Sequence, residues 1–253
     1  VQLAAQAVVA VTRNAMWSSC SAASSTLPLL QSTAVANIIF INIDWKRSRH
    51  NNPVSTHRNL TAIATTISSI VTSMKPAVIC CCEVGEAMNP MNLQQMFDLA
   101  DTIRTAWEAA ATEHPDIEVL FEVDAPYLTI WDGKCCECKR HQILENVYNV
   151  PGHRRKAQAF LCIMPGENDE EGIDIVNVHA PSGKPKLTDA HRYHLIRNLL
   201  QSSSMARPNK RIGEGRFLLG GDMNTIELGL SQILNKLRSL DILKTSNEVL
   251  SPT

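Results

Sequence analysis

The pair Asp222 and Asn224 offers a carboxylate and an amide two residues apart, directly after the run Phe217-Leu218-Leu219-Gly220-Gly221. The apolar part of this run predicts a buried strand, and open α/β sheets bind ligands beyond the carboxyl ends of their strands. The two glycines would let backbone and substrate approach closely. A carboxylate there can take a proton or meet a cation. Taken alone, the same residues also fit a turn that closes a strand.

Three further apolar runs end in polar residues of related chemistry. Residues 37–43 contain Asn42 near their end and lead to Asp44, residues 77–82 lead to Glu83, and residues 173–179 end in His179. Each of these residues could also have a purely structural role. Asn42 could form a hydrogen bond at a strand end, Glu83 could be the partner of a helix cap, and His179 could be a buried histidine with its hydrogen bonds satisfied. Asp44 and Glu83 are hard oxygen ligands, and Mg²⁺ typically takes one or two carboxylates together with waters and substrate phosphate.

The other polar residues suit the handling of a phosphate and a water. His179 can donate to a phosphate oxygen or balance its charge. Asn42 and Asn224 are neutral anchors, and Asp222 could orient or activate a water.

The elements that must position these residues alternate between strands and helices. Residue spacing predicts strands near 37–43, 77–82, 118–123, 127–131, 157–164, 173–179 and 217–219, and helices near 60–74, 93–107, 188–201 and 230–240. The strands on either side of the acidic turn 166–172 should form a hairpin. This alternation predicts a mixed sheet in a layered α/β domain.

Composition separates an N-terminal segment from one domain. Residues 1–34, with a Ser/Ala-rich stretch at 18–32, predict a low-complexity segment or linker, in which 2–11 fit a short helix or part of an upstream region. We expect one domain over 35–253. The net charge of -1 gives no global basic surplus, so anion recognition must come from local patches. No stretch approaches the length of a transmembrane helix.

The eight cysteines lack the pattern of a disulfide framework. Cys80, Cys81 and Cys82 are consecutive in an apolar run, which is typical of small buried side chains in a reducing compartment, the nucleus or the cytoplasm. Cys135 and Cys138, with His141 nearby, have the spacing of half a zinc site, but a second ligand pair is lacking. We therefore interpret residues 132–155 as a flexible insertion rather than a zinc site.

Four motifs in order resemble those of the endonuclease/exonuclease/phosphatase superfamily, which includes apurinic endonucleases, DNase I-like nucleases, retrotransposon endonucleases and sphingomyelinases. The motifs are Asn42-Ile43-Asp44, the block from Pro76 to Gly85, Val178-His179-Ala180-Pro181-Ser182 and Gly221-Asp222-Met223-Asn224. The resemblance covers about residues 37–240. It implies a four-layer α/β/β/α sandwich with mixed sheets and a phosphodiester hydrolysis that depends on Mg²⁺ or Mn²⁺.

The resemblance also assigns roles to individual residues. Two carboxylates are assigned to the metal, Glu83 as the main ligand and Asp44 as the second. Four side chains are assigned to the phosphate and the attacking water: Asp222, Asn224, His179 and Asn42.

Basic residues beside the motifs are candidates for substrate phosphates, whose contacts dominate nucleic-acid affinity. They could equally be ordinary charges of exposed loops. We name Arg192, which falls near an arginine common in the family, together with Arg47 and Arg216.

The family's last motif, usually Ser-Asp-His, is missing, because no histidine lies between Asn224 and Thr253. No strand is predicted after Leu240, so the domain is expected to be incomplete at its C-terminal end. A truncated sequence and a degenerate relative that binds without cutting both fit. The start at Val1 rather than Met favours truncation.

The sequence therefore predicts a Mg²⁺-dependent phosphodiester hydrolase, foremost an endonuclease that acts on nucleic acid, DNA more than RNA. Two alternatives stay open. One is a non-catalytic, retroelement-derived module that binds nucleic acid, and the other is a phosphodiesterase for lipids or small molecules.

Overall fold

The computed structural model describes residues 8–11, 37–43, 53–84, 93–122, 125–150, 153–180, 185–224 and 227–240. The elements in chain order are β1 (Val8–Val11), β2 (Ile38–Asn42), α1 (Pro53–Met74), β3 (Val78–Cys82), α2 (Leu93–Ala110), β4 (Ile117–Phe121), β5 (Tyr127–Asp132), β6 (Glu137–Val150), β7 (His153–Ile163), β8 (Ile173–His179), α3 (Pro185–Gln201), the 3-10 helix η2 (Ile212–Glu214), β9 (Phe217–Asp222) and α4 (Glu227–Ser239). None of these helices is long and apolar enough to cross a membrane.

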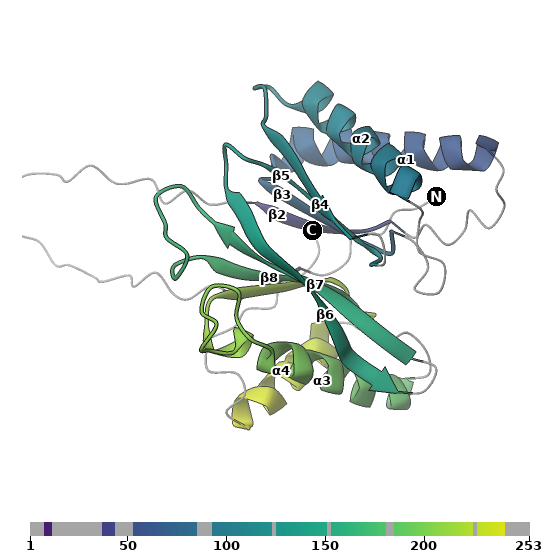
Figure 1. The fold of residues 1–253 in the computed structure, drawn as a ribbon. Coiled ribbons are helices and arrows are strands. Elements are labelled where there is room, and N and C mark those ends of the chain that lie inside the picture. The colour runs from purple at the N-terminus through teal and green to yellow at the C-terminus, as the bar shows by residue number, and fades with distance from the viewer. Residues whose placement is uncertain are drawn as a thin grey trace, which may run out of the picture.

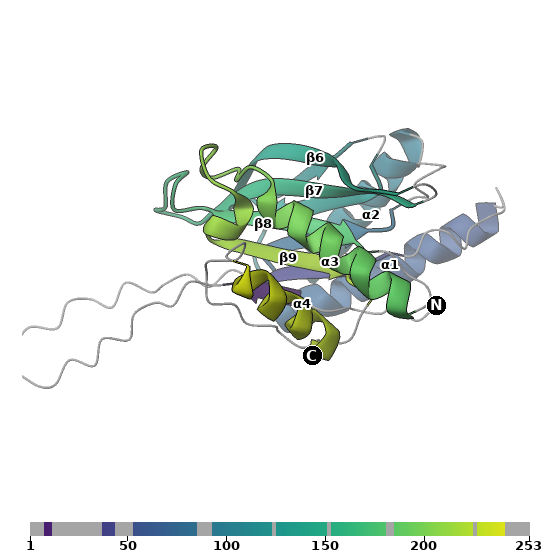
Figure 2. The same ribbon diagram turned by 90° about the horizontal axis from the view of Figure 1, so that it is seen from below.

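Two mixed sheets lie face to face, and each is covered on its outer side by helices (Figure 1). One sheet has the order β2-β3-β5-β4 and is covered by α1 and α2. The other has the order β1-β9-β8-β7-β6, and α3 and α4 lie across its outer face (Figure 2). The arrangement confirms the predicted four-layer α/β/β/α sandwich.

Each sheet contains one parallel pair of strands joined by a helix. In one sheet β2 and β3 are parallel and are joined through α1, and in the other β8 and β9 are parallel and are joined through α3. A parallel connection needs such a crossover, because the chain must return to the starting edge of the sheet. As a result, the carboxyl ends of the two strands in each parallel pair lie at the same end of their sheet.

Three apolar layers hold the sandwich together. The layer between α1, α2 and the four-stranded sheet includes the buried side chains of Ile67, Ile79, Leu99, Ile103, Leu128 and Ile130. The layer between the two sheets includes Phe40, Cys80, Phe160, Ile175 and Leu218, and the layer under α3 and α4 includes Leu161, Val176, Leu195, Leu199 and Leu237. Alternate residues of one strand therefore enter different layers, as the period of two requires.

The two sheets are in close contact where β9 faces β2. A Cβ atom on Gly220 would lie 2.4 Å from the ring of Phe40, so only glycine leaves room for this ring. Gly221 has a φ of +115°, and a Cβ atom there would lie 2.0 Å from the carbonyl oxygen of Val178. Gly220 thus lets the two sheets approach each other, whereas Gly221 lies close to its neighbour β8 within the five-stranded sheet.

A buried polar network also joins the sheets. The hydroxyl of Thr129 donates to Gln158 Oε1 at 2.7 Å, and Asn177 Nδ2 donates to the carbonyl oxygen of Cys81 at 2.9 Å. Asn177 Nδ2 also lies 3.4 Å from Gln158 Oε1. Because unpaired polar groups are costly in a dry core, these bonds fix one relative position of β3, β5, β7 and β8.

Two segments differ from their sequence-based prediction. The polar stretch 132–155 was interpreted as a flexible insertion, but much of it forms β6, the long edge strand that pairs with β7. Along β6, exposed charged residues such as Glu137 alternate with buried residues such as Cys138. This strand therefore lacks the continuous apolar run by which the other strands were predicted. In the N-terminal segment, Val8–Val11 is a strand paired with β9 rather than part of a short helix.

The consecutive cysteines of β3 are buried as expected. Cys80, Cys81 and Cys82 are all fully inaccessible to solvent. Burial raises the pKa of the Cys81 thiol to about 12 and also raises the pKa of the Cys82 thiol. These thiols therefore remain protonated at neutral pH and act as small apolar side chains.

The contacts of Gly220 and Gly221 predict which of the two alanine variants is less stable. Gly220→Ala should lower the free energy of unfolding by about 1–3 kcal/mol through overpacking. Gly221→Ala should cost more, because its obstacle is backbone and its φ is unfavourable for alanine. Phe40→Leu should partly rescue Gly220→Ala and leave Gly221→Ala unimproved. Urea denaturation of the single and double variants measures this, and an equal effect of Phe40→Leu on both glycine variants would contradict it.

Candidate active site

Four polar side chains gather where the carboxyl ends of the two parallel pairs meet. Asn42 ends β2, Glu83 follows β3, and His179 and Asp222 end β8 and β9. His179 and Asp222 are directly paired in the sheet register, as are Asn42 and Cys82. Each sheet therefore supplies two of the four residues, and the site lies at the seam between the sheets.

Two contacts cross this seam. Asn42 Nδ2 donates to Asp222 Oδ2 at 2.8 Å, and His179 Nδ1 lies 3.0 Å from Glu83 Oε1. Glu83 and Asp222 are each only 6% exposed. Burying carboxylates away from water is costly unless they are paired or hydrogen-bonded. The two cross-sheet contacts therefore hold a pair of carboxylates in an environment where their charge acts strongly on a bound group.

Strand alternation explains how three of these side chains reach the seam. Phe40, Leu218 and Ile175 belong to the apolar layer between the sheets. Asn42, Asp222 and His179 follow them at even spacing and so point into the same layer. The polar residues thus continue the inter-sheet layer to its edge.

Glu83 reaches the seam in another way. Ile79 and Cys81 belong to the layer under α1 and α2, so regular alternation would turn residue 83 toward the helices. Glu83 instead has a φ of +54°, which ends the alternation and accompanies its contact with His179. Such a conformation costs about 1–3 kcal/mol in a residue other than glycine and persists only where surrounding contacts enforce it.

Asn224 is the second site residue with a left-handed backbone, with a φ of +49°. Its backbone N–H donates to Asp222 Oδ1 at 2.9 Å, and its Nδ2 donates to the carbonyl oxygen of Ala180 at 2.8 Å. Asp222 thus accepts from Asn42 on one oxygen and from Asn224 on the other. Its carboxylate is fixed in orientation.

Tyr127 supports the site and was missed by the sequence analysis. Its hydroxyl donates to the carbonyl oxygen of Lys156 at 2.7 Å and accepts from the backbone N–H of His179 at 3.2 Å. The hydroxyl thereby ties β5 to β7 and β8 beside the imidazole. A tyrosine in an apolar strand was the available signal, because a buried tyrosine hydroxyl usually needs a partner.

The donor set suits a hard divalent cation. Glu83 and Asp222 supply carboxylate oxygens, and Asn42 and Asn224 supply amide groups, with no sulfur among them. Oxygen ligands of this kind fit Mg²⁺ or Mn²⁺. Glu83, together with Asp44, is the group expected to hold the ion. Asp44 lies outside the described residues.

Of the candidate arginines, the described structure places Arg216 away from this group. Arg192 lies within α3 and is 8% exposed. Arg216 precedes β9 and pairs with Glu167 at 2.8 Å. The six residues of β9 span about 20 Å, which places Arg216 at the opposite end from Asp222. Arg47 lies outside the described residues.

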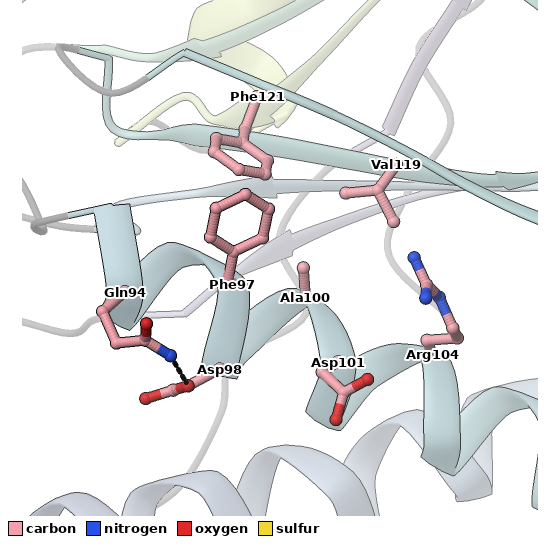
Figure 3. A pocket seen from close by; sticks show the side chains of 8 residues that line it. All are labelled: Gln94, Phe97, Asp98, Ala100, Asp101, Arg104, Val119 and Phe121. Atoms are coloured by element: carbon pink, nitrogen blue, oxygen red, sulfur yellow. Dashed lines mark hydrogen bonds between the residues drawn. The ribbon is translucent and has the colours of Figure 1, made fainter.

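A pocket elsewhere on the molecule is separate from this group. It lies between α2 and β4 on the outer side of the four-stranded sheet, and its lining includes Phe97, Phe121, Asp101 and Arg104 (Figure 3). Phe97 packs edge-on against Phe121, with ring centroids 5.4 Å apart. None of the four seam residues lines it.

Comparison with solved structures identifies the fold. D. rerio TDP2 with a single-strand DNA product matches with a TM-score of 0.50 at 13% identity, over 78% of this chain and 64% of that one. The inositol polyphosphate 5-phosphatase domain of SPSynaptojanin, in complex with inositol (1,4)-bisphosphate and calcium, matches with a TM-score of 0.44 at 13% identity, over 66% of this chain and 54% of that one. ANGEL2, a 2',3'-cyclic phosphatase, matches with a TM-score of 0.43 at 14% identity, over 64% and 44%.

The chain has the DNase I-like fold. It spans less than two thirds of the length of each of these three solved proteins. No family model and no curated protein matches the sequence. The DNase I-like fold therefore rests on structure, at an identity too low to carry a substrate from one protein to another.

The Tyr127 contacts lead to a stability prediction. Tyr127→Phe keeps the ring but leaves the Lys156 carbonyl and the His179 N–H without this partner, so the free energy of unfolding should fall by about 1–3 kcal/mol. Tyr193→Phe is the matched control, because the ring of Tyr193 is half-buried and contacts Lys236 through its face. Denaturant unfolding of both variants provides the measurement. A Tyr127→Phe protein as stable as wild type would show that the hydroxyl does not fix the site.

Proposed function

We propose that this protein is a divalent-metal-dependent phosphodiester hydrolase that acts on nucleic acid, DNA in preference to RNA. The observation that carries the proposal is the pair of buried carboxylates at the seam, each joined across it to a residue of the other sheet. Glu83 and Asp222 thereby sit on opposite sheets with a histidine and two amides around them. This combination suits a phosphate, a cation and a water better than it suits fold stability alone.

Asp222 is proposed to orient and activate the water. Both of its oxygens accept hydrogen bonds, from Asn42 Nδ2 and from the Asn224 N–H, so the carboxylate cannot swing. A fixed carboxylate can hold a water in line with the phosphorus and accept its proton as the new bond forms. Asn42 and Asn224 would then hold both the base and the phosphate oxygens.

His179 is proposed to bind the scissile phosphate. Its Nδ1 faces Glu83, so the ring presents Nε2 as its second polar atom. An N–H on Nε2 can donate a hydrogen bond to a phosphate oxygen. A divalent ion bound at Glu83 would polarise the phosphate and stabilise the leaving oxygen.

Nucleic acid is the proposed substrate for two reasons. TDP2, which shares the fold, is described with a single-strand DNA product. Basic residues also flank the motifs in the sequence, including Arg47 just after Asp44. The nuclear or cytoplasmic location remains part of this proposal and rests on the cysteine pattern.

The test is cleavage by the protein made from its complete natural coding sequence. With Mg²⁺ we expect cleavage of single-stranded and plasmid DNA, weaker cleavage of RNA, and loss of activity with a chelator. Glu83→Gln and Asp222→Asn should each lower the rate by at least about 100-fold, because each removes a group placed at the reacting phosphate. Asp169→Asn, in the turn at the other end of β7 and β8, is the control and should leave the rate unchanged.

The outcomes separate the proposal from its alternatives. Activity that survives both Glu83→Gln and Asp222→Asn would overturn the site. An inert protein that binds DNA with a steep dependence on salt would instead be a non-catalytic binding module. Hydrolysis of a lipid or small phosphodiester without cleavage of DNA would replace the proposed substrate while keeping the site.

A further inference from the structure

Three cysteine sulfurs meet between the sheets, at the end of the sandwich opposite the active site. Cys136 directly precedes β6, Cys138 is its second residue, and Cys162 lies near the end of β7. The three Sγ atoms are all within 4.8 Å of one another. Cys138 and Cys162 are direct partners in the antiparallel pair, and Cys136 is two residues earlier on the same face.

The surroundings of this cluster are apolar. Cys136, Cys138 and Cys162 are 3%, 8% and 0% exposed. They belong to the inter-sheet layer together with Trp131, Phe160 and Cys80. Within the described residues, the cluster contains no carboxylate or imidazole at the same range. It is therefore a set of soft ligands only.

We propose that Cys136, Cys138 and Cys162 bind a soft, thiophilic cation, either Cu⁺ or Zn²⁺. Thiolate ligands select these ions over Mg²⁺ or Ca²⁺. With a Zn–S distance of about 2.3 Å, sulfurs around one ion lie about 3.8–4.0 Å apart. No two of the three sulfurs are more than 4.8 Å apart, so small rotamer changes would bring them to the distances that an ion requires. The ion would join β6 to β7 within the core and would be separate from the hard cation at Glu83.

The ligand set differs from the one that the sequence pattern suggests. The CxxC pattern pairs Cys135 with Cys138, yet Cys135 is exposed and its sulfur lies 3.6 Å from Asp132 Oδ2. His141 contacts Glu122 at 3.3 Å and so is engaged elsewhere. Strand alternation places Cys136, and not Cys135, on the same face as Cys138. The pairing of β6 with β7 then brings Cys162, which is 24 residues after Cys138, into the cluster.

An ion pair also lies at this end of the five-stranded sheet. Cys162 pairs with Ile173 at the start of β8, and the start of β9, just after Arg216, pairs with the next residue, Asp174. Arg216 therefore lies at the same end of the five-stranded sheet as the cluster. Because Arg216 pairs with Glu167 at 2.8 Å, it contributes to a neutral ion pair there and not an uncompensated positive charge.

Metal loading of the whole protein tests the proposal. The protein is made in medium supplemented with Zn²⁺ or Cu⁺, purified under reducing conditions and assayed for metal content. A second sample is refolded with Cd²⁺, which reports thiolate ligation through its ultraviolet charge-transfer absorption. We expect one soft ion per chain and the charge-transfer band in the wild type.

Matched variants identify the ligands. Cys162→Ser and Cys136→Ser should lose the ion and the band, whereas Cys135→Ser, one residue away, should keep both. Glu83→Gln should also keep both, which separates this site from the active site. Absence of the ion and band in the wild type would show that the thiols serve packing alone and would overturn the proposal. Loss in Cys135→Ser with retention in Cys162→Ser would overturn it in favour of the sequence pattern.

A stability readout covers the case in which a serine variant fails to fold. Bound ion should raise the thermal midpoint of the wild type and of Cys135→Ser, because a ligand that binds only the folded state stabilises it. Cys162→Ala, which keeps an apolar core residue, should show no such rise. An equal rise in Cys162→Ala would contradict the proposal. The assay of metal content identifies which of the two ions is bound.

Discussion

The close contact between the two sheets is the constraint on which the rest of this structure depends. Gly220 admits the ring of Phe40, and the bonds among Thr129, Gln158 and Asn177 join the same two sheets through polar groups. The apolar contact sets how near the sheets come, while the polar bonds select one alignment, because a shifted alignment would leave buried groups unpaired. Asn177 lies two residues before His179 and bonds to the carbonyl of Cys81, two residues before Glu83. The alignment of the sheets is therefore also the alignment of the site.

The site exists only as long as that alignment holds. Each of the two site carboxylates has a contact with the opposite sheet, since both the Asn42–Asp222 and the Glu83–His179 contacts cross the seam. The left-handed backbone of Glu83 is unfavourable by itself and accompanies the contact with His179. The stability of the sandwich therefore offsets the cost of burying two carboxylates and holds them in place. Hydrolysis of a phosphodiester would use this arrangement.

The layer between the sheets changes character along its length. At one edge it ends in carboxylates and amides, which suit a hard cation, and toward the other it contains three clustered sulfurs, which suit a soft one. Apolar residues such as Phe160 and Ile175 lie in this layer. Because the two ligand sets differ in chemistry as well as in place, each proposed cation would be excluded from the site of the other.

The sequence by itself determined most of the local elements, and it named the candidate site residues. Apolar runs gave the strands that end at Asn42, His179 and Asp222, and four ordered motifs indicated the superfamily fold that the structure shows. It did not determine β6, because exposed charged residues interrupt the apolar run of this strand. It also did not determine the role of Tyr127, because the partner Lys156 is distant in the chain. Only the tertiary structure decided that Glu83 turns against its strand's alternation, that Arg216 lies away from the site, and that Cys162 joins Cys136 and Cys138. The reason is physical: spacing along a strand fixes which face a residue occupies, but only the packing of one sheet on another fixes what that face meets.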